Sequence, residues 1–138
     1  MDDINNKEKS LLNISGKKIL IVDDDMINRM LATFILKKYQ VVISEAGNGE
    51  EAIQFLNNNS CDLVLMDIQM PILDGYQASK IIRQKLNLTI PIIALTGSDS
   101  KEELQNCFNA GMNDYLFKPI NEEQFIQTIS KWITKIND

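Results

Sequence analysis

Histidine is absent from the 138-residue chain, which removes the commonest general base and every imidazole metal ligand. Chemistry must therefore use carboxylates, hydroxyls and lysine, and no phosphohistidine can form within the chain. Cysteine is scarce, since only Cys61 and Cys107 occur, beside apolar positions of a predicted strand and a predicted helix. We expect both thiols to act as small reduced core residues rather than as a disulfide or metal site.

Long apolar segments and concentrated positive charge are also missing. No apolar run approaches the roughly 20 residues that cross a membrane, and residues 1–9 lack the apolar core of a secretion signal. The net charge is −5 and the 14 lysines and arginines are scattered, so direct nucleic-acid binding is not expected. With 44% hydrophobic residues the chain fits one domain with an ordinary core. We expect a soluble, cytoplasmic domain without a membrane segment.

Short apolar segments alternate with segments of helical periodicity, five of each. Strands are predicted at 18–22, 40–45, 63–67, 90–95 and 115–117, and helices begin near residues 26, 49, 75, 101 and 122. This alternation predicts an α/β, doubly wound, five-stranded parallel sheet with helices on both faces. The common strand order for this count is 2-1-3-4-5. We interpret residues 1–15 as a linker or N-terminal tail and residues 16–138 as the domain.

The helical periodicity also predicts which side chains share a face. The periodicity places Ile27, Met30, Leu31, Phe34 and Ile35 on one face of the first helix. The fourth helix, at 101–109, is shorter and is expected to bury Leu104 and Phe108.

The segment that ends at Asp67 organises the rest of the chain. An apolar strand, 63–66, stops at this carboxylate, and Met70-Pro71 cannot continue a central strand. Asp74 followed by Gln77 then has the spacing of a helix N-terminal capping box. Asp67 therefore lies where a strand leaves the sheet, the edge at which open α/β sheets bind ligands. We expect Asp67 to be presented at that edge rather than buried.

Further polar residues follow the neighbouring strands. Asp23 and Asp24 end the first strand, which the predicted order places beside the third, so both should meet Asp67. Three close carboxylates raise one another's pKa and call for a cation, and all-oxygen ligands favour Mg²⁺, Mn²⁺ or Ca²⁺ over zinc. Thr96 and Lys118 end the fourth and fifth strands. Together these groups indicate phosphoryl transfer, with Asp67 as the nucleophile that becomes an acyl phosphate.

Over residues 17–136 these motifs resemble the receiver domain of two-component response regulators, which has a flavodoxin-like fold. The resemblance places the family's residues as follows: the acidic pair at Asp23 and Asp24, the phosphoacceptor at Asp67, the switch hydroxyl at Thr96, the lysine at Lys118 before a cis Pro119, and the switch aromatic at Tyr115. It implies that Asp24 and Asp67 bind Mg²⁺ directly, Asp23 binds it through water, and the backbone carbonyl of Gln69 completes the protein ligands.

Two segments, 22–32 and 109–120, resemble the receivers of hybrid histidine kinases in particular. The resemblance implies a histidine kinase or a histidine phosphotransfer protein as the phosphodonor, and a downstream protein target that the sequence does not identify. It also implies a signalling domain that assists its own phosphorylation and dephosphorylation, rather than an enzyme. The sequence fits a stand-alone receiver and a receiver excised from a hybrid kinase equally well.

Two alternative functions differ in class. A haloacid-dehalogenase-like phosphohydrolase has an Asp-x-Asp-x-Thr/Val motif, which residues 23–27 approach, but Ile27 breaks the pattern. A receiver-like module that binds proteins without being phosphorylated is the other alternative. The complete set of acidic residues, hydroxyl and lysine argues against that module.

Overall fold

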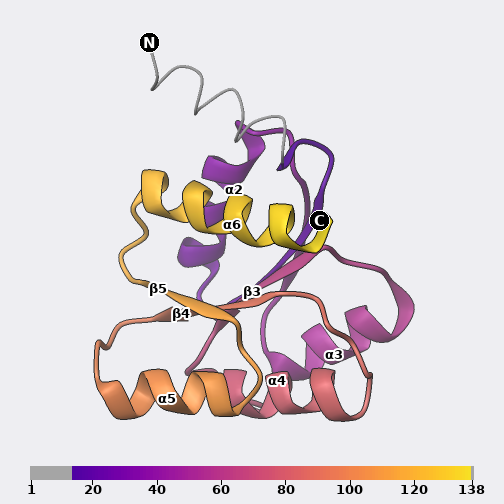
Figure 1. Ribbon diagram of the computed structural model, residues 1–138, viewed down its shortest axis with the longest axis vertical. Helices are drawn as coiled ribbons and strands as arrows, with labels where there is room; N and C mark the ends of the chain where they lie inside the picture. Colours follow the sequence, from indigo (N-terminus) through magenta and orange to yellow (C-terminus); the bar gives the residue numbers. More distant parts are fainter. Residues whose placement is uncertain (1–13, 138) are drawn as a thin grey trace.

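The computed structural model describes residues 14–137, with side chains described to Thr134. Strands and helices alternate along the whole of this part of the chain (Figure 1). The elements are β1 (Lys18–Val22), α2 (Met26–Lys37), β2 (Val42–Ala46), α3 (Gly49–Asn58), β3 (Leu63–Asp67), α4 (Gly75–Gln84), β4 (Ile92–Thr96), α5 (Lys101–Asn109), β5 (Asp114–Phe117) and α6 (Glu122–Asn137). No helix in the described part has both the length and the apolar character needed to span a bilayer.

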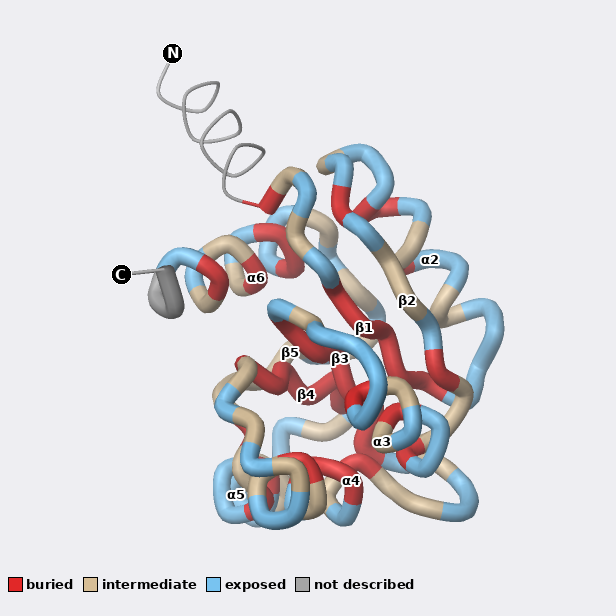
Figure 2. The backbone as a smooth tube through the Cα atoms, turned by 90° about the vertical axis from the view of Figure 1, so that its right-hand side faces the viewer, coloured by how far each residue is buried: buried red, intermediate tan, exposed pale blue. Residues whose placement is uncertain are grey.

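The five strands form one parallel sheet in the order β2-β1-β3-β4-β5, which confirms the predicted topology. Helices α2 and α6 cover one face, and α3, α4 and α5 cover the other (Figure 1). All five residues of β3 and all five of β4 are buried, because each central strand has helices on both sides (Figure 2). The carboxyl ends of β1, β3, β4 and β5 consequently meet at one edge.

Alternate side chains of the central strands enter two separate cores. Leu63 and Leu65 pack with α2 and α6, whereas Val64 and Met66 pack with the helices on the opposite face. Ile14 is fully buried in the first of these cores. Residues 1–13 of the predicted linker lie outside the described part, and the domain boundary at residue 16 stays a prediction.

The predicted capping box is confirmed, since Asp74 and Gln77 exchange both of its hydrogen bonds at the start of α4. At the start of α2, Asp25 accepts a hydrogen bond from the Ile27 backbone N–H. Strand β2 begins at Val42 rather than at Gln40, because Gln40 has a φ of 61° that no strand residue adopts. Strand β4 and helix α4 differ from their predicted ends by two residues or fewer at each end.

The predicted apolar face of α2 is not the face that packs on the sheet. Ala32, Ile35 and Leu36 are buried against the sheet. The other members of the predicted face, Ile27, Met30, Leu31 and Phe34, are 44–72% exposed. The helix has two apolar faces, and periodicity alone does not say which one meets the sheet.

The burial predicted for α5 was also partly wrong. Phe108 is 45% exposed and Leu104 is half-buried, while Cys107 is the buried residue of this helix. The reason is that α5 rests on the sheet mainly through the small Cys107 side chain, which turns Phe108 towards β5 and solvent.

Arg83, in the last turn of α4, ties several segments together. Its guanidinium donates hydrogen bonds of 2.8–2.9 Å to the carbonyls of Gly111 and Leu88 and to the side-chain oxygen of Asn113. Gly111 has a φ of 99°, and a Cβ there would lie 2.6 Å from Arg83 Cγ. Gly111 therefore allows both the turn after α5 and the close approach of Arg83.

Candidate functional site

A cleft of about 550 Å³ opens at the carboxyl edge of the sheet. It brings together the polar residues that follow four different strands. Six of the predicted site residues line it, namely Asp23, Asp24, Asp67, Gln69, Thr96 and Lys118. Tyr115 is the one predicted site residue that does not.

Asp67 lies at the floor of this cleft, so the prediction that it would be presented rather than buried was wrong. Only 6% of Asp67 and 1% of Asp23 are exposed, whereas Asp24 is exposed to solvent. Asp67 is still paired with Leu95 of β4 within the sheet, so its backbone lies inside the sheet rather than beyond its edge. A reactant must therefore enter the cleft to reach its carboxylate.

Lys118 supplies the positive charge at the floor. Its Nζ lies 2.8 Å from Asp67 Oδ1 and 3.5 Å from Asp23 Oδ2. The backbone N–H of Lys118 donates to the Thr96 carbonyl at 2.8 Å, which fixes the end of β5 against β4. The peptide between Lys118 and Pro119 is cis, as predicted.

The electrostatics of Asp67 reflect this burial. Burial raises the pKa of the Asp67 carboxyl to about 6; the Lys118 contact opposes the rise, and the charges of Asp23 and Asp24 add to it. Burial lowers the pKa of Lys118, but its pairing with Asp67 and Asp23 outweighs this and leaves the pKa raised. The ionised form of Asp67 is thus costly without further positive charge.

The three carboxylates have the arrangement of a cation site. Asp23, Asp24 and Asp67 each offer a carboxylate oxygen, and these oxygens lie within 4.8 Å of one another. Asp23 Oδ2 is buried and has no hydrogen-bond donor, although Lys118 is nearby. Such an oxygen-only set fits a hard divalent cation such as Mg²⁺ better than zinc.

Thr96 and Tyr115 occupy positions that could change. The Thr96 hydroxyl exchanges hydrogen bonds with the backbone of Ser98, at 3.1 and 3.2 Å, rather than with Asp67. Tyr115 is half-buried on β5, and its ring lies between those of Phe108 and Phe117, at centroid distances of 6.2 and 5.3 Å. Tyr115 is therefore held outside the cleft by aromatic neighbours.

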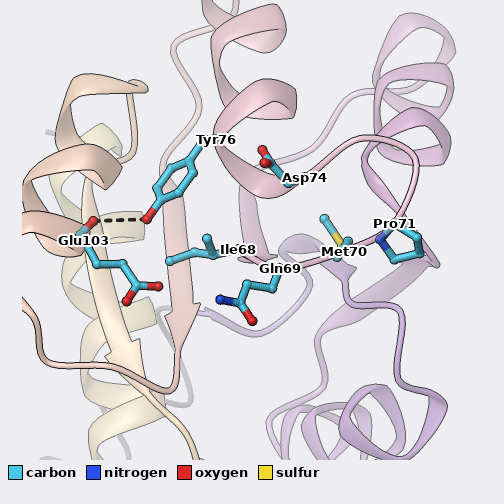
Figure 3. A pocket seen from close by; sticks show the side chains of 7 residues that line it. All are labelled: Ile68, Gln69, Met70, Pro71, Asp74, Tyr76 and Glu103. Carbon is cyan, nitrogen blue, oxygen red and sulfur yellow. Dashed lines mark hydrogen bonds between the residues drawn. The ribbon is translucent and has the colours of Figure 1, made fainter.

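The sequence analysis missed Glu103, in the first turn of α5. Glu103 lines both the cleft and a neighbouring pocket of about 510 Å³ (Figure 3). Figure 3 shows its carboxylate and the Gln69 amide on opposite sides of that pocket, while its backbone carbonyl accepts a hydrogen bond from Tyr76. An acidic residue in a first helical turn is usual for its effect on the helix dipole, so nothing in the sequence marked Glu103.

The sequence model of the response regulator receiver domain family matches residues 19–130. The chain belongs to this receiver family. Hybrid signal transduction histidine kinase A of Dictyostelium discoideum is 39% identical over 121 residues, which are 84% of this chain but 6% of that protein. The receiver chain spans only 6–14% of the length of eight curated relatives that it matches, all of them histidine kinases or sensor proteins.

Solved receiver structures share the fold over almost their whole length. The receiver domain of sensor histidine kinase PA1611 from Pseudomonas aeruginosa, described with a magnesium ion in its active-site cleft, is 34% identical. Its TM-score is 0.80, covering 87% of this chain and 99% of that one. The receiver domain of Saccharomyces cerevisiae Ssk1, solved with the histidine phosphotransfer protein Ypd1, is 32% identical with a TM-score of 0.82, covering 88% and 91%. The resemblance to hybrid-kinase receivers is confirmed.

Proposed function

We propose that this receiver domain accepts a phosphoryl group from a phosphohistidine onto Asp67 as a step of a two-component phosphorelay. The convergence of Asp67 with Lys118 and two further carboxylates carries the proposal. A carboxylate oxygen of Asp67 attacks phosphorus, the bond between phosphorus and the donor imidazole nitrogen breaks, and that nitrogen keeps the electron pair. The product is an acyl phosphate on Asp67.

The surrounding residues position and neutralise the transferred group. Asp23, Asp24, Asp67 and the backbone carbonyl of Gln69 would hold Mg²⁺, which when bound neutralises charge on the phosphoryl oxygens. Lys118 already reaches Asp67 and can pair with a phosphoryl oxygen there. The same groups would also assist hydrolysis of the acyl phosphate. In this proposal the domain is a signalling domain that accepts a phosphoryl group from a donor, rather than an enzyme that acts on a separate substrate.

Signalling would follow from the same change of charge. The Thr96 hydroxyl would leave Ser98 and bond to the phosphoryl group, which vacates space behind β4. Tyr115, on the adjacent strand, would then turn inward and alter the surface formed by α5, β5 and α6. A downstream protein would recognise that altered surface.

The relatives guide the proposed setting. The similar Ssk1 receiver binds Ypd1, so a histidine phosphotransfer protein or a histidine kinase is the proposed phosphodonor, in the cytoplasm. The domain would extend over residues 16–138 after a linker of residues 1–15. Direct binding of nucleic acid is not part of this proposal, given the net charge of −5.

Labelling with acetyl phosphate and Mg²⁺, followed by intact-mass measurement, tests the assignment of Asp67. The wild type should gain one phosphoryl group and Asp67→Asn none, whereas Asp99→Asn, at an exposed carboxylate, should label normally. Labelling of Asp67→Asn under the same conditions would show that another residue is the acceptor. Sustained hydrolysis of p-nitrophenyl phosphate would instead favour the phosphohydrolase. If the wild type is not labelled, the result would favour the binding module that is not phosphorylated.

A further inference from the structure

One carboxylate on the wall of the Asp67 cleft takes no part in the acceptor site described above. Glu103, half-buried in the first turn of α5, lines both this cleft and the neighbouring pocket of about 510 Å³. It is not one of the three carboxylates whose oxygens lie within 4.8 Å of one another at the floor. Among the described residues, no lysine or arginine forms an ion pair with it. The Glu103 carboxylate is therefore available to bind a molecule in the cleft.

The backbone around Glu103 fixes where this carboxylate lies. The Ser100 hydroxyl accepts a hydrogen bond from the Glu103 backbone N–H at 3.4 Å and caps α5. The Tyr76 hydroxyl, on α4, donates to the Glu103 carbonyl at 3.2 Å. Figure 3 shows the side chain pointing towards the Gln69 amide, across the pocket that adjoins the cleft. Two hydrogen bonds thus hold the helical turn that carries the carboxylate.

The position of Asp67 limits how water could reach an acyl phosphate on it. Asp67 lies at the floor of the cleft and is only 6% exposed, so a phosphoryl group on it would extend towards the opening. Displacement at phosphorus is in line, with the attacking oxygen opposite the leaving oxygen. The attacking water would therefore enter from the opening and contact the walls of the cleft. Glu103 belongs to these walls, because it is half-buried and lies outside the group of carboxylates at the floor.

Few groups in the cleft can accept a proton from that water. Histidine, the commonest general base, is absent from the chain. Five carboxylates line the cleft; three of them form the proposed cation site, and Asp25 accepts the hydrogen bond that caps α2. Lys118 is a cation paired with Asp67 and has no lone pair to offer. Glu103 is the carboxylate that remains.

We propose that Glu103 is the general base for hydrolysis of the acyl phosphate on Asp67, and so limits how long the phosphorylated state lasts. The inference rests on the proposed function of Asp67. Glu103 accepts a proton from water as the water oxygen attacks phosphorus. The bond between phosphorus and the Asp67 carboxylate oxygen breaks, and that oxygen keeps the electron pair. Inorganic phosphate leaves, Asp67 is again a carboxylate, and Glu103 returns the proton to solvent.

The decay of the acyl phosphate, measured apart from its formation, tests this role. The protein is labelled with acetyl phosphate and Mg²⁺, freed of the donor by rapid gel filtration, and followed by intact-mass measurement. In Glu103→Gln, hydrolysis should slow by about tenfold or more relative to labelling, because an amide cannot take up the proton. The matched control is Glu102→Gln, which removes the same charge from the same helical turn at an exposed side chain. Its acyl phosphate should decay at the wild-type rate.

Hydrolysis in deuterium oxide separates proton transfer from the charge of Glu103 alone. The wild-type acyl phosphate should decay more slowly in deuterium oxide than in ordinary water, since the transferred proton comes from the attacking water. This isotope effect should shrink in Glu103→Gln. Glu103→Ala is a second variant that also lacks the base, and it should show the same slow decay and the same reduced isotope effect.

The remaining outcomes separate the role of Glu103 from that of Asp67. If the wild type is not labelled, the proposed function of Asp67 fails and the role of Glu103 fails with it. If the wild type is labelled but both Glu103 variants decay at its rate, only the role of Glu103 is overturned. That role is also overturned if Glu102→Gln slows decay equally, if the isotope effect persists in Glu103→Gln, or if labelling falls as much as hydrolysis.

Discussion

Asp67 and Lys118 form an ion pair that a transferred phosphoryl group has to reorganise. Lys118 Nζ lies 2.8 Å from the carboxylate oxygen Oδ1, and Asp23 Oδ2 is a second acceptor at 3.5 Å. The lysine can therefore move its charge from the carboxylate to a phosphoryl oxygen with a small displacement. Charge-assisted contacts of this kind are stronger in a buried cleft than in water.

Asp24 should be the residue on which Mg²⁺ affinity depends most directly. It is the exposed member of the three carboxylates and has no other structural role in the described contacts. We expect a wild-type dissociation constant in the micromolar to millimolar range, since few protein oxygens are available. Asp24→Ala should weaken binding by about tenfold or more, as measured by isothermal titration calorimetry.

Asp74→Ala is the matched control for this experiment. Asp74 caps α4 through its bond to the Gln77 N–H at 2.8 Å, so its loss should lower the free energy of unfolding by about 1 kcal/mol. The Asp74→Ala variant should bind Mg²⁺ with the same affinity as the wild type. Unchanged affinity in Asp24→Ala would contradict the proposed ligands.

At the scale of elements, Gly75 controls how α4 meets the end of β3. A Cβ on Gly75 would press on the Asp67 carbonyl and lie 2.9 Å from the Ile68 Cα. We expect Gly75→Ala to lower the free energy of unfolding in urea by about 1–3 kcal/mol, because backbone atoms would have to move. Phosphorylation of Asp67 should also slow as the strand end shifts.

Gly97→Ala provides the comparison, since no heavy atom other than those of Gly97 and its two chain neighbours lies within 4 Å of the added Cβ. Its free energy of unfolding should stay within about 0.5 kcal/mol of the wild type. Equal effects of the two substitutions would show that the close packing at Gly75 is not what limits stability.

Helix α5 buries only Cys107, fewer residues than any other described helix. We expect beryllofluoride with Mg²⁺, a mimic of the phosphoryl group, to change amide hydrogen exchange more in residues 96–118 than in residues 40–58. The reason is that in the proposed switch Thr96 would leave its Ser98 bonds before Tyr115 turned. Equal or absent changes in the two regions would contradict the switch while leaving phosphorylation of Asp67 intact.

The sequence could predict the site because parallel strands share one carboxyl edge. Four site residues, Asp23, Asp67, Thr96 and Lys118, lie at or just after the end of a strand, so the strand order predicts that they meet. Burial depth was not predictable, since it depends on how far the neighbouring loops rise around Asp67. The orientation of α2 about its axis was not predictable either, because two of its faces are apolar.

At the scale of the whole molecule, the two thiols should make stability depend on alkaline pH. Burial raises the pKa of both Cys61 and Cys107. The unfolded chain therefore loses these protons first as the pH rises past the ordinary thiol value of about 8.5. The contribution of the thiols to stability is fully present below that value and is lost as the pH rises through the folded-state pKa values.

Urea denaturation at pH 7 and pH 9.5 measures this effect. The wild type should lose more free energy of unfolding between the two conditions than a variant that combines Cys61→Ser with Cys107→Ala. Tyr39 cancels in that difference, because burial and Glu122 raise its pKa and neither thiol contributes to the shift. Parallel losses in the two proteins would exclude the thiols as the cause.

The Arg83 contacts determine the geometry of any movement of α5. Arg83 holds Gly111 and Asn113, just beyond the C-terminal end of the helix, whereas the N-terminal end follows the exposed turn at Gly97. A tilt of α5 should therefore turn about its C-terminal end, where the Arg83 contacts hold the chain. Nine residues at about 1.5 Å each make an arm of roughly 13 Å, so a tilt of about 10° moves the free end by roughly 2 Å. The N-terminal end of α5, beside Asp67, would therefore move the most. A partner bound across α5 would respond to a change in the angle of the helix rather than to a translation of the whole helix.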